Sequence, residues 1–179
     1  MFPSSTSKVQ RIIDYVGGVA INVTAAEVKE INITGSEVAK IENKQIISII
    51  NPGVQTLSGS QAVAYSRIRH VGGDDFQRTE RQRTVLSVLF KKLSTKNITD
   101  MPAVVDQLLP CVETSLKTAE IMNFGKYTLT HKMSNLEQSR VPYDGLYKDE
   151  IVNKMDVLTW NKKQTIDKLH EFIFGTRDM

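Results

Sequence analysis

The segment from Asp75 to Leu93 constrains the fold more than any other part of this sequence. At about 100° per residue, Val85, Leu89 and Leu93 fall on one face of a helix. Asp75 is placed to cap the first turn of that helix. An apolar stripe of this kind must be buried against other structure. We therefore expect a helix over about 76–93 that packs on a sheet through these three residues.

Toward its N-terminus the same stripe changes from apolar to charged and polar. Arg78, Arg81 and Gln82 occupy, in the first two turns, the face that Val85 occupies later. The helical wheel places Arg83 on the opposite, solvent side. A charge that faces the interior costs on the order of several kcal/mol unless an anion neutralises it. The helix N-terminus adds its own partial positive charge and free N–H groups at the same place.

Two further arginines precede this helix. Arg67 and Arg69 lie on one side of the chain if their segment is extended, and Gly72 and Gly73 allow the intervening loop to fold them toward the helix. Five of the eight arginines fall between positions 67 and 83, although the net charge of the whole chain is only +3. Because a guanidinium fork binds two phosphate oxygens at once, the cluster predicts a site for a phosphorylated ligand.

A structural explanation competes with this one. Arg78 or Arg81 could instead pair with a neighbouring acid or with a distant carboxylate. Asp75 is better suited to cap the helix and orient Arg78 than to act as a general base. His70, beside the cluster, is interpreted as a bystander, and the single cysteine, Cys111, as a buried apolar residue that can form no intrachain disulfide.

The rest of the sequence predicts one layered α/β domain over residues 1–179. An apolar content of 40% suffices for one core, and no apolar run reaches the roughly 18 residues of a membrane-spanning helix. The first residues lack the basic start and apolar stretch of a signal peptide. Further helices are expected at 9–16, 25–31, 58–65, 97–109, 118–124 and 162–174, strands at 19–23, 136–141 and 150–153, a turn at 51–53, and either strand or helix at 46–50.

The arginine cluster matches a family pattern. The segment from Leu57 to Arg69, which ends in Arg-x-Arg, is followed by Asp-x-x-Arg-x-x-Arg-Gln from Asp75 to Gln82, and together they resemble the signature of the LytR–CpsA–Psr family. Upstream, the Gly-Gly-Val sequence that begins at Gly17 resembles the entry into a strand of that family. The resemblance covers about residues 9–175 and corresponds to the later half of the family's catalytic domain.

This resemblance implies a fold, an activity and partners. The fold is α/β (α+β), a three-layer α/β/α sandwich with a mixed central sheet, here incomplete on its N-terminal side. The family implies an enzyme on the outer face of the bacterial cell membrane, mostly in Gram-positive cells. It transfers a phosphoglycan such as teichoic acid or capsule polymer from a polyprenyl pyrophosphate carrier to peptidoglycan, with Mg²⁺. Carried over by position, the pyrophosphate ligands are Arg67, Arg69, Arg78 and Gln82, with Arg81 close behind, and Arg69 and Arg78 are the catalytic pair.

The family's earlier half has no match in this sequence. We expect that half to supply the membrane anchor and the acidic residues that hold the metal, so catalysis by these residues alone stays open. Two alternatives are carried forward. The chain could be a binding module that holds polyprenyl phosphates without turnover, or it could track nucleic-acid phosphates with residues 67–92. The second alternative is disfavoured because few aromatic residues accompany the arginines and because the arginines lie on the apolar stripe.

Overall fold

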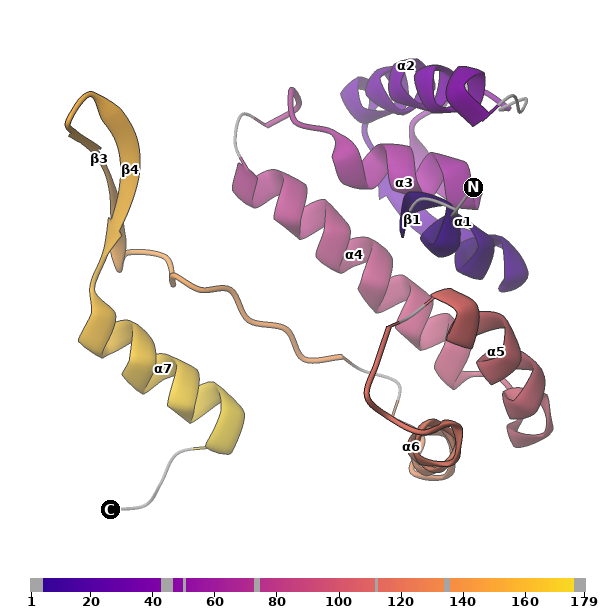
Figure 1. The fold of residues 1–179 in the computed structure, drawn as a ribbon. Coiled ribbons are helices and arrows are strands. Elements are labelled where there is room, and N and C mark those ends of the chain that lie inside the picture. The colour runs from indigo at the N-terminus through magenta and orange to yellow at the C-terminus, as the bar shows by residue number, and fades with distance from the viewer. Residues whose placement is uncertain are drawn as a thin grey trace. The chain divides into compact units, whose positions relative to one another are not determined.

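The computed structural model describes residues 5–42, 47–49, 51–72, 75–111, 113–133 and 136–175. The chain divides into two compact units, Met1–Leu136 and Glu137–Met179, which are described separately. No described helix is both long enough and apolar enough to cross a membrane. The first unit contains the following elements in order (Figure 1): α1 (Ser5–Tyr15), β1 (Val19–Val23), α2 (Ala25–Glu42), β2 (Gly53–Leu57), α3 (Gly59–Arg67), α4 (Asp75–Ser94), α5 (Met101–Leu108) and α6 (Thr118–Thr130), with short 3₁₀ turns at Ile98–Asp100 and Leu109–Cys111.

The sheet of the first unit consists of β1 and β2, which pair antiparallel from Val19 opposite Leu57 to Val23 opposite Gly53. In β1 the side chains alternate, with Val19, Ile21 and Val23 buried and the two between them exposed. This alternation is why the strand could be predicted with its correct bounds. In β2 burial also alternates, but the half-buried positions are Gly53 and Gln55 and the apolar Val54 is exposed, so the residue types do not alternate and the strand was not predicted.

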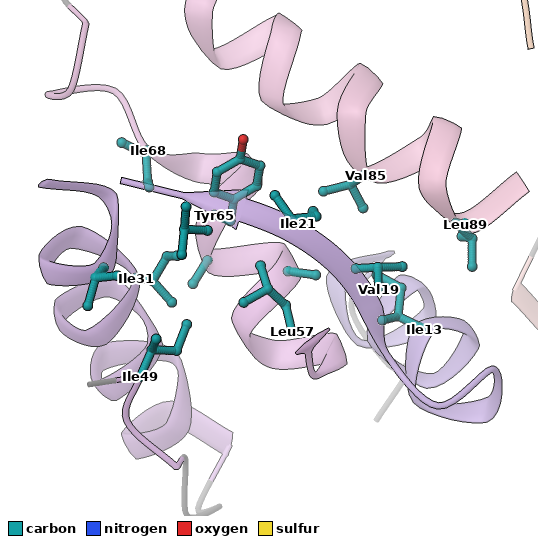
Figure 2. Close-up of a cluster of buried hydrophobic side chains, with 14 of the residues drawn as sticks. Ile13, Val19, Ile21, Ile31, Ile49, Leu57, Tyr65, Ile68, Val85 and Leu89 are labelled. Atoms are coloured by element: carbon teal, nitrogen blue, oxygen red, sulfur yellow. The ribbon is translucent and has the colours of Figure 1, made fainter. Parts of the chain in front are cut away.

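Helix α4 packs on this sheet as predicted. Val85 and Leu89 are buried and belong to the same apolar cluster as Val19 and Ile21 of β1 (Figure 2). Leu93 is partly buried and packs against that cluster. The cluster also takes side chains from the other elements of the core, namely Ile13 of α1, Ile31 of α2, Leu57 of β2, and Ala62, Ala64 and Tyr65 of α3. The stripe therefore predicts the direction in which α4 faces.

Several helix bounds differ from those expected. Helix α2 continues past its predicted end at Ile31 to Glu42. Helix α6 continues through Gly125, which was expected to stop it, to Thr130. A Cβ at position 125 would lie 2.1 Å from Cε of Met101, so this glycine leaves room for the end of the Met101 side chain and does not end the helix. The helix expected over 97–109 is divided between the 3₁₀ turn and α5.

The second unit is a hairpin followed by a helix. Strands β3 (Tyr147–Val152) and β4 (Met155–Trp160) pair antiparallel, and Asn153 and Lys154 both adopt positive φ in the turn between them. That pair of conformations suits the twist of a two-residue hairpin. Helix α7 (Lys162–Phe174) has the predicted bounds, and its N-cap Asn161 accepts a hydrogen bond from the Gln164 backbone N–H at 3.1 Å. The strand expected at 136–141 has no regular secondary structure in its described residues, and β4 was not predicted.

The α+β class expected from the sequence is confirmed, because both units combine helices with a small antiparallel sheet. The sheets themselves are simpler than the mixed central sheet that the resemblance implied. In the described residues each sheet has two antiparallel strands. The undecided segment 46–50 lies partly outside the description, and its residues 47–49 form neither helix nor strand.

Candidate functional site

The connection between α3 and α4 presents two of the predicted arginines to solvent. Helix α3 begins with a capping box at Ser58 and ends at Arg67, so Arg67 is helical and not part of an extended segment. The next residue, Ile68, has an extended backbone and a side chain buried in the core. Arg67 and Arg69, on either side of it, are exposed. The buried isoleucine therefore anchors the segment while its neighbours face outward.

The guanidinium group of Arg81 is buried and hydrogen-bonded within the protein. It is 5% exposed, and its Nε donates to Oε1 of Glu27 at 2.9 Å. Its Nη1 donates to the carbonyl oxygen of Ile68 at 3.2 Å, and its Nη2 donates to the carbonyl oxygen of Val71. All three nitrogens thus have protein partners. For Arg81 the geometry favours the alternative of a distant carboxylate partner over the expected contact with pyrophosphate.

The partner, Glu27, was not predicted as part of the site. Its Oε2 accepts hydrogen bonds from the backbone N–H of Thr24 at 2.9 Å and from the Thr24 hydroxyl at 3.0 Å, which caps α2. Burial raises the pKa of Glu27, but the hydrogen bonds from Thr24 and the contact with Arg81 outweigh it, so the pKa lies below its ordinary value. The spacing Thr24-x-x-Glu27 signals the cap in the sequence, whereas nothing local signals a partner 54 residues away.

Arg78 and Asp75 form a neighbouring ion pair at the start of α4. Nη1 of Arg78 lies 3.2 Å from Oδ1 of Asp75, and the two side chains are 24% and 75% exposed. Asp75 is the first residue of the helix rather than its cap, because the helix begins one residue earlier than expected. It nevertheless lies where it can orient Arg78. Within the described part of the chain, the Nε atom of Arg78 is buried and has no hydrogen-bond partner.

Gln82 and Arg83 are not distributed as the helical wheel predicted. Gln82 is exposed, and its Nε2 donates to the carbonyl oxygen of Ser66 at 3.4 Å. Arg83 was expected on the solvent side, yet its side chain is 26% exposed, close to the value for Arg78, and it pairs with Glu80. The wheel gives only the direction in which a side chain leaves the helix. A long side chain can then fold back along the surface, which explains this error.

The structure brings the first two turns of α4 beside the end of α3. The hydrogen bonds from Gln82 to Ser66 and from Arg81 to Ile68 both join these elements. The two segments that carry Arg67, Arg69, Arg78 and Gln82 therefore lie side by side, and the buried Arg81 joins them. Such a surface combines separate guanidinium groups with a helix N-terminus, and this arrangement suits an anion with several oxygens. Among the residues that the structure describes, no three His, Cys, Asp or Glu side chains are grouped so that they could hold a metal ion.

Comparison with known proteins places this surface in context. The model of the LytR_cpsA_psr family matches residues 7–171. The fold is similar to that of Bacillus subtilis TagV, with 18% identity, a TM-score of 0.64 and coverage of 93% of this chain and 59% of TagV. A structure of TagT bound to LI-WTA has 17% identity and a TM-score of 0.61, with coverage of 93% and 56%. Lin1025 of Listeria innocua has 18% identity and a TM-score of 0.60, with coverage of 96% and 67%.

The chain therefore spans less than two thirds of the length of the TagV and TagT chains that it matches. At these identities the likeness to solved structures establishes the fold. A comparison with curated proteins finds no match.

Proposed function

Because the chain belongs to the LytR–CpsA–Psr family, we propose that it forms part of a cell-envelope phosphotransferase. Its substrate would be a glycopolymer, such as a teichoic acid or a capsule polymer, that is linked to a polyprenyl pyrophosphate carrier. The acceptor would be peptidoglycan, and the place of action would be the outer face of a bacterial cell membrane. In this proposal the later half of the domain, represented by this chain, binds the pyrophosphate through its arginines.

One observation supports the binding role above the others. Arg67 and Arg69 are exposed on either side of the buried Ile68, and the segment that carries them lies beside the N-terminal turns of α4. Arg78 adds a guanidinium whose Nε has no hydrogen-bond partner in the described residues. Several arginines around one helix N-terminus can satisfy the many oxygens of a pyrophosphate at once.

The same groups suit the chemistry of phosphoryl transfer. When an acceptor hydroxyl attacks phosphorus, negative charge grows on the non-bridging oxygens and on the departing lipid phosphate. Arg69 and Arg78 would neutralise that charge, and Arg67 and Gln82 would hold the carrier in position. A magnesium ion, which the family implies, would supply further neutralisation. The described residues offer no fitting group of ligands for it, so every step proposed for this chain uses its arginines.

A titration of the purified chain with a short-chain polyprenyl pyrophosphate tests the proposal. We expect Arg69→Ala and Arg78→Ala each to weaken binding by about 1.5–3 kcal/mol, the range for a lost hydrogen bond to a charged group. That corresponds to a loss of affinity of about tenfold to a hundredfold. Lys91→Ala is the matched control, because Lys91 is an exposed cation on the same helix. This change removes one charge but no predicted ligand, so the affinity of the variant for the pyrophosphate should stay unchanged.

Equal losses for Arg78→Ala and Lys91→Ala would contradict a defined pocket and favour a diffuse phosphate-tracking surface, as in the nucleic-acid alternative. Titration at two salt concentrations separates these further, because tracking along a nucleic acid gives a steep dependence on salt. A transfer assay distinguishes the enzyme from a module that binds the carrier without turnover, since the two make the same prediction for binding.

A further inference from the structure

We propose that the buried Glu27–Arg81 ion pair is a positioning device that holds the segment of Arg67 and Arg69 in the orientation that binds the anion. This inference rests on the proposed function, because it assigns how the same site is assembled. It changes the role of Arg81 from a ligand of the pyrophosphate to a residue that acts through its neighbours, and it adds Glu27 as a member of the site.

The hydrogen bonds of Arg81 reach the backbone at two places in the arginine segment. One accepting carbonyl belongs to Ile68, the residue between the two exposed arginines, and the other belongs to Val71, three residues later. A guanidinium presents its donors in a rigid plane, so two carbonyls bound to it are fixed relative to each other. The hydrogen bonds from Arg81 of α4 therefore fix the direction in which the side chains of Arg67 and Arg69 leave the backbone.

Glu27 fixes the other side of this guanidinium. Its Oε1 accepts from Nε of Arg81 at 2.9 Å, and its Oε2 is bound by Thr24 at the start of α2. The side chains of Arg81 and Glu27 are 5% and 11% exposed. Three elements of the first unit thus meet at one buried pair: the start of α2, the segment after α3, and the second turn of α4.

This geometry argues against direct binding by Arg81. The carboxylate already neutralises its charge, each of its nitrogens has a partner, and the side chain is almost fully buried. A buried ion pair is weak evidence for stability, because desolvation offsets much of the Coulomb attraction. Its stronger effect is to specify a single arrangement, and a binding segment that is already ordered loses less entropy when the ligand binds.

The first measurement is independent of any ligand. Trypsin cleaves after Arg69 only when the segment opens, so the cleavage rate reports its local stability. In Arg81→Lys the charge remains, but a single ammonium cannot satisfy three separated acceptors in a plane. We expect cleavage after Arg69 to accelerate roughly tenfold, as for one lost hydrogen bond to a charged group. Glu27→Gln is the second variant. It leaves the Arg81 side chain in the sequence but removes its charged partner, and it should accelerate the same cleavage.

The second measurement is titration of the same variants with a short-chain polyprenyl pyrophosphate. Both should lose affinity roughly tenfold, in step with the faster cleavage. Lys92→Met is the control for general destabilisation. Lys92 tethers the other end of α4 by donating to the carbonyl oxygens of Gly17 and Gly18 at 3.0 Å and 2.8 Å. It should lower the midpoint of unfolding yet leave both the cleavage after Arg69 and the affinity unchanged.

Each other outcome is decisive. Weaker binding without faster cleavage in Arg81→Lys would restore Arg81 as a direct ligand and overturn the proposal, as would unchanged cleavage in both variants. Faster cleavage in Lys92→Met would show that the effect is global and would also overturn it. If the unmutated chain does not bind the pyrophosphate, the proposed function fails, whereas the cleavage experiment still decides whether the pair positions the segment.

Discussion

At the scale of single residues, Glu27 makes a prediction about acid stability. Its pKa in the folded chain lies below the ordinary value of 4.5, because hydrogen bonds from Thr24 and Arg81 outweigh the effect of burial. A carboxyl group of this kind stabilises the fold above the pKa of the unfolded chain, and the contribution disappears as the pH falls through the folded pKa. We therefore expect the free energy of unfolding to decrease below about pH 4.5.

The variant Glu27→Gln isolates this contribution. At pH 7 it should be destabilised by roughly 3–5 kcal/mol, the cost of leaving one partner of a buried pair unneutralised. The difference from the unmutated chain should shrink as the pH falls through the folded pKa of Glu27, because a protonated Glu27 resembles glutamine. Urea unfolding over a series of falling pH values measures this, with Glu80→Gln as a control at an exposed carboxylate of α4. A difference that stays the same over the whole series would show that ionised Glu27 does not stabilise the fold.

The same pair shows what sequence can and cannot reveal about a site. The concentration of arginines from 67 to 83 predicts a binding surface, because the residues are close in the chain and the helical period relates them. The sequence did not reveal how the contacts of these arginines differ. Arg81 is set apart by a carboxylate 54 residues upstream, and Arg83 approaches the burial of Arg78 by folding along the helix. Both depend on tertiary contacts that a wheel does not contain.

At the scale of the elements, the contact between α1 and α3 makes the next prediction. A Cβ at Gly59 would lie 2.2 Å from the carbonyl oxygen of Gln10, a backbone atom that cannot move without displacing α1. The Gly59 backbone N–H also donates to Oδ1 of Asp14 at 2.6 Å. Gly59→Ala should therefore destabilise the chain by about 1–3 kcal/mol through overpacking. Chemical denaturation measures this against Ser60→Ala, and equal stabilities for the two variants would contradict such a tight contact.

The elements differ in how well the sequence predicts them, for physical reasons. Helices α4 and α7 have apolar residues at helical spacing and clear signals at their starts, and they were found nearly at their true bounds. Strand β1 alternates buried and exposed residues, whereas β2 buries only Leu57 and β4 has no buried residue in its own unit. Gly125 was expected to end a helix, but it lies within α6 beside the Met101 side chain. Elements whose identity depends on such pairing or packing were the ones missed.

At the scale of the whole molecule, the family match and the structure bear on different parts of the prediction. The match over residues 7–171 establishes the family, and the combination of helices with small antiparallel sheets establishes the α+β class. The described sheets have two strands each, while the chain covers 59% of TagV. A two-stranded sheet covers little of the apolar surface that a half-buried strand or helix presents. Exposed apolar side chains are the expected consequence.

The second unit carries such side chains. On α7, Phe172, Ile173 and Phe174 are 42%, 57% and 66% exposed, and in the hairpin Ile151 and Trp160 are 75% and 45% exposed. Contiguous exposed apolar surface promotes association. We expect the purified chain to self-associate or to bind an apolar dye, and we expect Ile173→Lys to reduce either effect because it places a charge on the exposed end of α7. Light scattering after size exclusion, together with dye fluorescence, measures both. A monodisperse monomer with no dye binding would show that these side chains are covered in solution, and it would favour a chain that is stable by itself.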